Sequence, residues 1–90
     1  MSTTVHFIVD GKVQGVGFRR FVLHAANQLN LKGFVTNLAD GTIECMAQGD
    51  VSALTEFETL LRQGPRFALV NSVTCTDVEG GKQYTSFRIV

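Results

Sequence analysis

The order in which two kinds of hydrophobic pattern alternate is the feature that most limits how this chain can fold. Five segments have the alternation or composition of strands, and two have apolar residues at the three- and four-residue spacing of amphipathic helices. The strands are predicted at Thr4–Asp10 (ended by Gly11), Phe34–Leu38, Thr42–Gln48, Leu69–Asp77 and Thr85–Val90. One helix is predicted from Phe18 to the "NLKG" stop, and the other from an Asp50 cap to about Gln63, with Val51, Leu54, Phe57, Leu60 and Leu61 facing inward.

Each predicted helix connects two strands, and "ADGT" is a hairpin turn between the second and third strands. This order predicts an α+β fold, a two-layer sandwich of the ferredoxin-like kind, βαββαβ with an additional C-terminal strand. Right-handed crossovers place both helices on one face of a mostly antiparallel sheet. Residues 1–90 are expected to form a single domain, because the chain is short, 44% apolar and without a visible linker.

Charge and composition exclude several classes of function. The formal net charge is zero, but residues 1–33 contain four basic residues and one acidic residue, whereas the remainder contains four and seven. General attraction to nucleic acid or to acidic membranes is therefore not expected. No segment resembles a signal peptide or a membrane span, so a cytoplasmic location is expected. A monomer is expected because no exposed apolar stripe is evident.

The two cysteines, Cys45 and Cys75, have neither metal-ligand spacing nor a nearby histidine. They are predicted to be reduced, buried core thiols, kept apart by the first strand of the sheet. No metal ion or cofactor is predicted.

The stretch "VQGVGFRR", Val13–Arg20, is the strongest candidate for a functional site. It lacks the lysine of a Walker A loop, the third glycine of a dinucleotide fingerprint and a cysteine nucleophile at position 13. What remains is a run of backbone N–H groups at a helix N-terminus beside arginine, which suits a phosphate-sized anion. On spacing alone, a plain strand-to-helix turn whose glycines permit positive φ is equally consistent.

The two arginines are distinguished by their angle around the helix. At about 100° per residue, Arg19 lies at the border of the buried face and Arg20 nearly opposite it. Arg19 is therefore predicted to fold back over the loop, and Arg20 to be a solvated surface charge.

Longer segments carry a family resemblance. "VDGKVQGVGFR" (Val9–Arg19) and "GFVTN" (Gly33–Asn37), with "GP" at 64–65 and the final "SFRIV", resemble the acylphosphatases over the whole chain. Cys45 departs from the aliphatic residue that would be ordinary at its position. The resemblance implies hydrolysis of the carboxyl–phosphate anhydride of acyl phosphates, with inorganic phosphate or sulfate as product-like ligands. It implies Arg19 as the phosphate-binding arginine, Asn37 as the residue that orients water, and phosphate contacts from the amides of Gly15, Val16, Gly17, Phe18, Arg19 and Arg20.

The chemistry suits these residues. An acyl phosphate is an activated anhydride with a carboxylate leaving group, so it needs charge neutralisation and a water in line with the scissile bond. Asn37 has both a donor and an acceptor with which to hold water, although without the motif a local turn bond in "NLADG" would be the commoner role. His6 and His24 are predicted on outer surfaces away from the loop, and Phe57, Phe67 and Phe87 in packing.

Two rival functions have the same fold. An RNA-binding module needs aromatic residues at the centre of the open sheet face. The predicted open positions of the first and third strands contain no aromatic and two acidic residues, so this surface is not expected to stack bases. These positions are His6, Ile8, Asp10, Thr42, Glu44, Met46 and Gln48. A noncatalytic domain that senses phosphate or another anion is the stronger rival, because it would need the same loop. Turnover of an acyl phosphate separates a sensor from an enzyme.

Overall fold

Two helices and five strands follow one another in the predicted order. The computed structural model describes residues 2–90. Its elements are β1 (Thr3–Lys12), α1 (Phe18–Gln28), β2 (Lys32–Asn37), β3 (Ile43–Gly49), α2 (Val51–Gln63), β4 (Leu69–Val78) and β5 (Phe87–Ile89).

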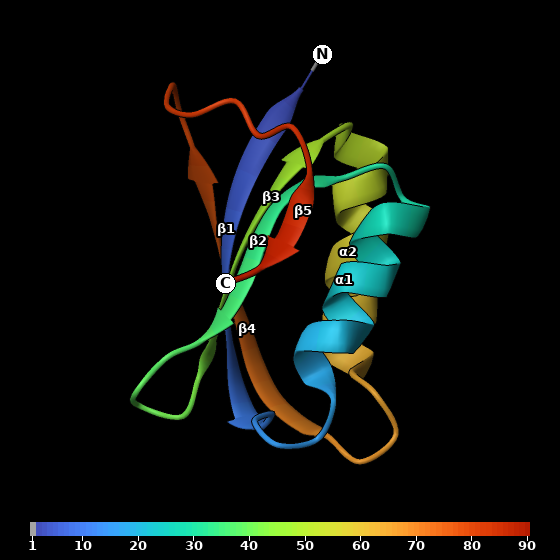
Figure 1. The fold of residues 1–90 in the computed structure, drawn as a ribbon, viewed down its shortest axis with the longest axis vertical. Coiled ribbons are helices and arrows are strands. Elements are labelled where there is room, and N and C mark those ends of the chain that lie inside the picture. Colours follow the sequence, from blue (N-terminus) through green and yellow to red (C-terminus); the bar gives the residue numbers. More distant parts are fainter. Residues whose placement is uncertain (1) are drawn as a thin grey trace.

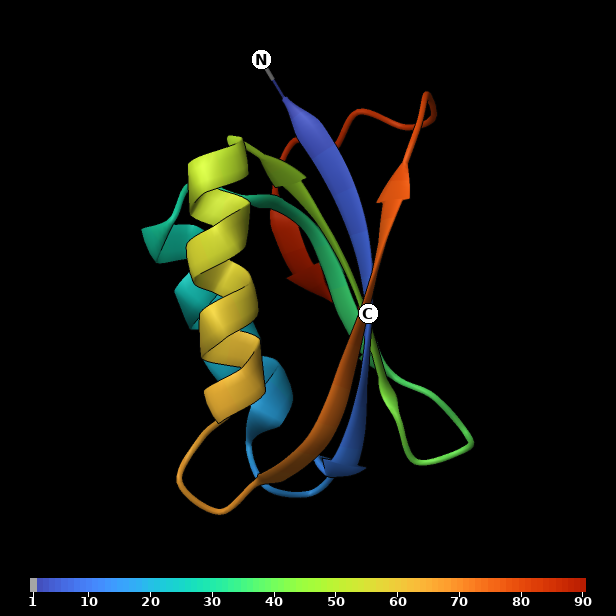
Figure 2. The same ribbon diagram turned by 180° about the vertical axis from the view of Figure 1, so that it is seen from behind.

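The strands form a single mixed sheet in the order β4-β1-β3-β2-β5. β1 pairs antiparallel with β3 and β4, β2 pairs antiparallel with β3, and β5 adds parallel to β2. Both helices cover the same face of this sheet, and the other face is open (Figures 1 and 2). The predicted two-layer ferredoxin-like sandwich with an additional C-terminal strand is confirmed.

The core fills the space between the helices and the covered face of the sheet. The alternation predicted for the third strand is confirmed, because Ile43, Cys45 and Ala47 are all fully buried. The ring of Phe57 on α2 packs edge-on against Phe7 and Phe87, with centroids 5.6 and 6.3 Å apart. These contacts hold α2 against β1 and β5 on either side of the centre of the sheet. The loops that connect the helices to the strands therefore start from rigid elements.

Several details of the predicted elements are wrong. β2 begins at Lys32 and not at Phe34, and β5 covers only Phe87–Ile89 and not Thr85–Val90. β1 does not end at Gly11: it continues to Lys12 through a register shift between Asp10 and Gly11, because a bulge lets the strand bend and keep its pairing with β4. Val51 does not face inward but is 62% exposed. It is the first residue of α2 and lines an open cleft between this helix and β1 and β4, whereas Leu54 and Leu61 further along are buried.

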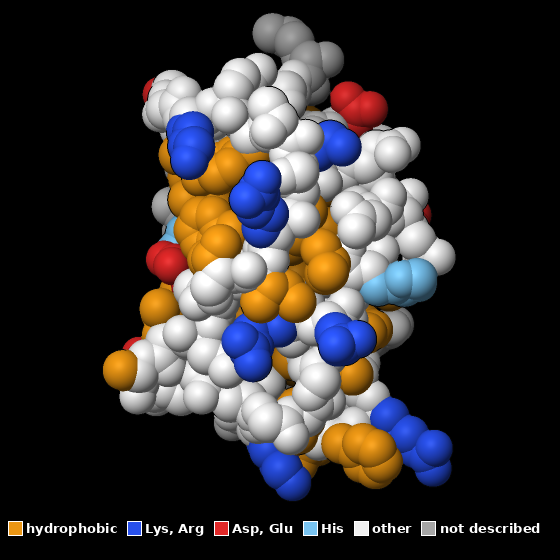
Figure 3. All heavy atoms as spheres, viewed as in Figure 1, with side chains coloured by type: hydrophobic (Ala, Val, Ile, Leu, Met, Phe, Trp, Pro, Cys, Tyr) orange, Lys and Arg blue, Asp and Glu red, His pale blue; other side chains and the backbone are white. Residues whose placement is uncertain are grey.

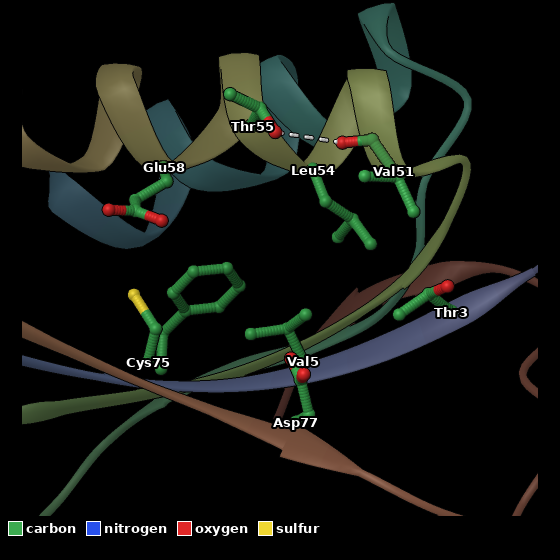
Figure 4. A pocket seen from close by; sticks show the side chains of 9 residues that line it. Thr3, Val5, Val51, Leu54, Thr55, Glu58, Cys75 and Asp77 are labelled. Carbon is green, nitrogen blue, oxygen red and sulfur yellow. Dashed lines mark hydrogen bonds between the residues drawn. The ribbon is translucent and has the colours of Figure 1, made fainter.

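The cysteines agree only in part with the prediction. Both are free, and β1 separates their strands, since Cys45 and Cys75 pair with Phe7 from opposite sides. Cys45 is buried, but Cys75 is exposed. β4 is an edge strand, and Cys75 points into a cleft between it and α2, toward Glu58 (Figure 4).

The open face of the sheet carries both polar and apolar side chains. His6 Nε2 lies 2.9 Å from Glu44 Oε2 across β1 and β3. β2 contributes Phe34, whose ring packs against Tyr84 with centroids 6.1 Å apart.

Phe67 was expected to pack in the core or at an edge, but it is 69% exposed, because it lies in the loop after α2 with Arg66 over its ring.

Candidate active site

The loop between β1 and α1 has the geometry of an anion-binding nest. Gly15 and Gly17 adopt positive φ angles of 73° and 80°, and a Cβ at either position would meet nothing within 4 Å. The glycines are therefore required by backbone conformation and not by crowding. Left-handed residues that alternate with ordinary ones turn successive N–H groups toward one concave side. The loop is therefore a candidate anion-binding site.

Within the described residues 2–90, no acceptor pairs with the backbone N–H groups of the first turn of α1. Gly17 is the N-cap, and within residues 2–90 no side chain caps the helix and no acidic residue lies in its first turn. The first intrahelical bond runs from Phe21 N to Gly17 O at 3.1 Å. The N–H groups that precede it at the start of the helix have no intrahelical partner. They and the positive end of the helix dipole favour a negative charge here.

A cavity of about 290 Å³ opens at this helix start and joins the residues that the two sequence motifs supply. Arg19 and Arg20 both line it and both are exposed, so the cavity does not by itself separate their roles. Val16 does not line it, because its side chain packs against the core. The lining residues are Val13, Gly15, Gly17, Phe18, Arg19, Arg20, Asn37 and Ile89.

Basic side chains are spread over the face of the molecule that carries α1, β2 and β5. Acidic side chains appear only at the margins of that face (Figure 3). This agrees with the excess of basic residues in the first 33 positions. The site therefore lies on the side of the molecule that attracts anions.

Asn37 ends β2 and lines the same cavity as the glycine loop. Its Oδ1 is buried and has no hydrogen-bond partner within residues 2–90. An unsatisfied buried acceptor costs about 1–3 kcal/mol, so native proteins rarely keep one without a use. The local turn bond that would be its commoner role is made instead by Asp40, whose Oδ1 accepts from Thr42 N and Oγ1 at 3.0 and 2.6 Å. The same bonds lower the pKa of Asp40.

The other reactive side chains lie away from the cavity. Neither His6 nor His24 lines it. Burial raises the pKa of both cysteine thiols, and Glu58 raises that of Cys75 further, so neither is an activated nucleophile. Residues 2–90 contain no cluster of three or more His, Cys, Asp or Glu side chains that could hold a metal ion. No helix in the same range is long and apolar enough to cross a membrane.

Sequence reasoning missed two residues at this site. Ile89 of β5 forms an apolar wall of the cavity, and only the parallel pairing of β5 with β2 brings it there. Gln14, inside the glycine motif, donates hydrogen bonds from Nε2 to the backbone of the β2–β3 hairpin. The sequence does contain a signal for Gln14, because a polar side chain stands there between Val13, which is buried, and Gly15 of the loop.

The fold and the cavity define a class of protein: a ferredoxin-like sandwich with a glycine loop and two arginines at the start of its first helix. Within residues 2–90, no side chain caps this helix. The acylphosphatase family model matches residues 5–89. The chain is 45% identical over 88 residues to an acylphosphatase of Koribacter versatilis, covering 98% of this chain and 80% of that one. It is 44% identical to an acylphosphatase of Chlorobaculum tepidum, covering 96% and 94% of the two chains.

Solved structures agree with these matches. The crystal structure of acylphosphatase from Bacillus subtilis superposes with a TM-score of 0.95 at 38% identity, covering 100% of this chain and 99% of that one. The chain belongs to the acylphosphatase family. It is an enzyme that hydrolyses acyl phosphates to a carboxylate and inorganic phosphate.

Proposed function

We propose that the β1–α1 loop binds the phosphoryl group of the acyl phosphate and that Asn37 positions the attacking water. The observation that carries this proposal is that Asn37, whose buried Oδ1 has no hydrogen-bond partner within residues 2–90, lines the same cavity as the glycine nest and Arg19. A site that only bound an anion would need the nest and the arginine. It would have no use for an unsatisfied acceptor beside them.

The loop and Arg19 neutralise the phosphoryl charge. In the proposed complex, the oxygens accept hydrogen bonds from the amides of residues 15–20, and the guanidinium of Arg19 adds a planar pair of donors. The bonds are aimed at the oxygens on which negative charge is concentrated as the phosphoryl group is transferred. Preorganised donors of this kind are often the largest single contribution to catalysis.

Asn37 Oδ1 accepts a hydrogen bond from the water and holds the water oxygen in line with the anhydride bond. The water oxygen forms the new P–O bond, the bond between phosphorus and the acyl oxygen breaks, and the carboxylate leaves. The protons of the water pass to the phosphate product and to solvent. The leaving carboxylate is a weak base, so the step needs no protein nucleophile and no general acid.

The proposed roles, phosphoryl binding by the loop with Arg19 and water positioning by Asn37, are tested by the variant Asn37→Ala. The measurement is steady-state hydrolysis of benzoyl phosphate. We expect kcat to fall by roughly 10²-fold, the scale on which one positioned polar group contributes, while the competitive inhibition constant of inorganic phosphate changes little. Asn71→Ala, in the edge strand β4, is the matched control. Near-normal kcat in Asn37→Ala would refute the role of Asn37, and noncompetitive inhibition by phosphate would place the anion site elsewhere.

We further propose that the enzyme acts without a metal ion, as a monomer, in the cytoplasm. The support is that the loop amides and arginine supply the positive charge, and that both cysteines are free thiols. Unchanged turnover in excess chelator and a sedimentation mass of one chain are the expected results. Loss of activity on chelation with recovery in a divalent ion would overturn the first point, and a dimer mass the second.

A further inference from the structure

Gln14 connects the two halves of the site through its side-chain amide. Nε2 donates to Leu38 O at 2.8 Å and to Thr42 O at 2.9 Å. We propose that Gln14 is a positioning residue for hydrolysis, which holds the β2–β3 hairpin, and with it Asn37, at a fixed distance from the phosphate loop. This inference rests on the proposed role of Asn37.

The position of Gln14 in the chain makes it suited to this task. It follows Val13, which is 1% exposed and fixed in the core, and it precedes Gly15, the first left-handed residue of the nest. Its acceptor Leu38 follows Asn37 directly. The phosphate loop begins at Gly15, one residue after Gln14, and Asn37 lies one residue before the acceptor Leu38. The hydrogen bonds of Gln14 therefore connect the two parts of the site directly.

The two acceptors stand on opposite sides of the hairpin turn, Leu38 directly after β2 and Thr42 directly before β3. Leu38 N donates to Thr42 O at 2.9 Å, so the two carbonyls belong to the last rung before the turn. Both protons of the Gln14 amide are used, one on each side of the turn. Within residues 2–90, no other side chain of the 13–17 loop is hydrogen-bonded to the hairpin.

The expected consequence is a loss of alignment without a loss of binding. Without the amide, the hairpin is held by its own ladder, by the Asp40 turn and by the pairing of β3 with β1, which ends at Val9 and Ile43. None of these bonds connects the end of the hairpin to the phosphate loop itself. Misplacement of a reacting group by about 1 Å can cost on the order of 10²-fold in rate. The nest keeps its shape, because that shape is set by the backbone angles of Gly15 and Gly17.

The experiment is a double-mutant cycle on kcat for benzoyl phosphate, with the phosphate inhibition constant measured for each variant. Gln14→Ala should lower kcat by about tenfold or more while phosphate inhibition changes less than about threefold. In the Asn37→Ala background, Gln14→Ala should lower kcat no further, because the two residues act through the same water. A purely structural role would lower kcat by the same factor in both backgrounds.

Two further variants keep the result interpretable. Gln14→Glu has the same size but replaces both donors by acceptors that face two carbonyls, so it should lower kcat at least as much as Gln14→Ala. Asp40→Ala removes the two bonds at the far end of the same hairpin, and it should lower the melting temperature while kcat is kept. Phosphate inhibition in each variant shows that its site is folded.

The outcomes separate this inference from the function on which it rests. Full kcat in Asn37→Ala would refute the proposed function and the role of Gln14 with it. Loss of kcat in Asn37→Ala with full kcat in both Gln14 variants would refute the role of Gln14 alone. Independent, multiplicative losses would also overturn it.

Discussion

The two helices of this protein begin in opposite ways, although neither N-terminus is capped by a side-chain hydrogen bond within residues 2–90. α1 starts from Gly17 in the left-handed region and has arginines at its second and third positions. α2 starts from Asp50 in extended conformation, so a carboxylate already lies at its positive end. Leu54 N bonds to Asp50 O, as Phe21 N does to Gly17 O.

The comparison shows what an anion site needs beyond a helix N-terminus. Both helix starts offer free amides and a favourable dipole. Within residues 2–90, it is α1 that adds a loop with two left-handed glycines, permanent positive charge and a cavity that Asn37, with its buried unsatisfied acceptor, also lines. At α2 the negative charge comes from the chain itself, and the neighbouring Val51 is exposed to solvent.

Among the changes that test the difference between the two helix starts, Arg19→Lys is expected to cause the largest loss of activity. Lysine keeps the charge but loses the planar fork, and a hydrogen bond to a charged group is worth about 1.5–3 kcal/mol. We expect kcat/KM for benzoyl phosphate to fall by roughly 10–100-fold and phosphate inhibition to weaken. Arg20→Lys is the matched control, with a change of less than about threefold. The reverse ranking would show that the angular assignment of the two arginines is wrong.

A smaller loss is expected from Gly17→Ala, which changes the helix start without touching its charges. The added methyl meets no atom within 4 Å, so its effect comes from the φ angle of 80°. Left-handed conformation costs a non-glycine residue about 1–2 kcal/mol, which should weaken phosphate inhibition by about tenfold if the nest opens. Gly80→Ala, with a φ of 65° and equal space, should leave phosphate inhibition unchanged. Equal inhibition constants in the two variants would argue against a backbone nest.

The smallest effect is expected at the start of the other helix. Asp50→Asn removes a charge that favours the dipole of α2 by about 0.3–1 kcal/mol, so the free energy of unfolding should fall by that amount. Kinetic constants should stay at the parental values, because Asp50 does not line the cavity at α1. A drop in kcat in this variant would mean that the two helix starts are not independent.

The sequence predicted most of this architecture because each element has an unambiguous period and clear boundaries. The buried face of β3 and the end of α2 at Gln63 were both correct. The errors lie where neighbours in space decide the outcome. The bulge that carries β1 past Gly11 depends on pairing with β4, and the exposure of Cys75 depends on how far α2 reaches over an edge strand.

The site was predictable in composition but not in geometry. The motif implied the loop, Arg19 and Asn37, and the cavity brings them together. Two features could not be obtained from spacing. Ile89 reaches the cavity only because β5 pairs with β2, and Gln14 bonds to a hairpin 24 residues away along the chain. Both depend on long-range register, which a local pattern does not encode.

The most direct test of the central claim is an NMR titration of the ¹⁵N-labelled protein with inorganic phosphate. The amide resonances of residues 15–20 should show the largest shifts and report one saturable site. The amides at the start of α2, residues 51–54, should stay in place as the internal comparison. Shifts that are equal at the two helix starts, or that are spread over the lysines and arginines of the surface, would contradict a phosphate site built by the glycine loop.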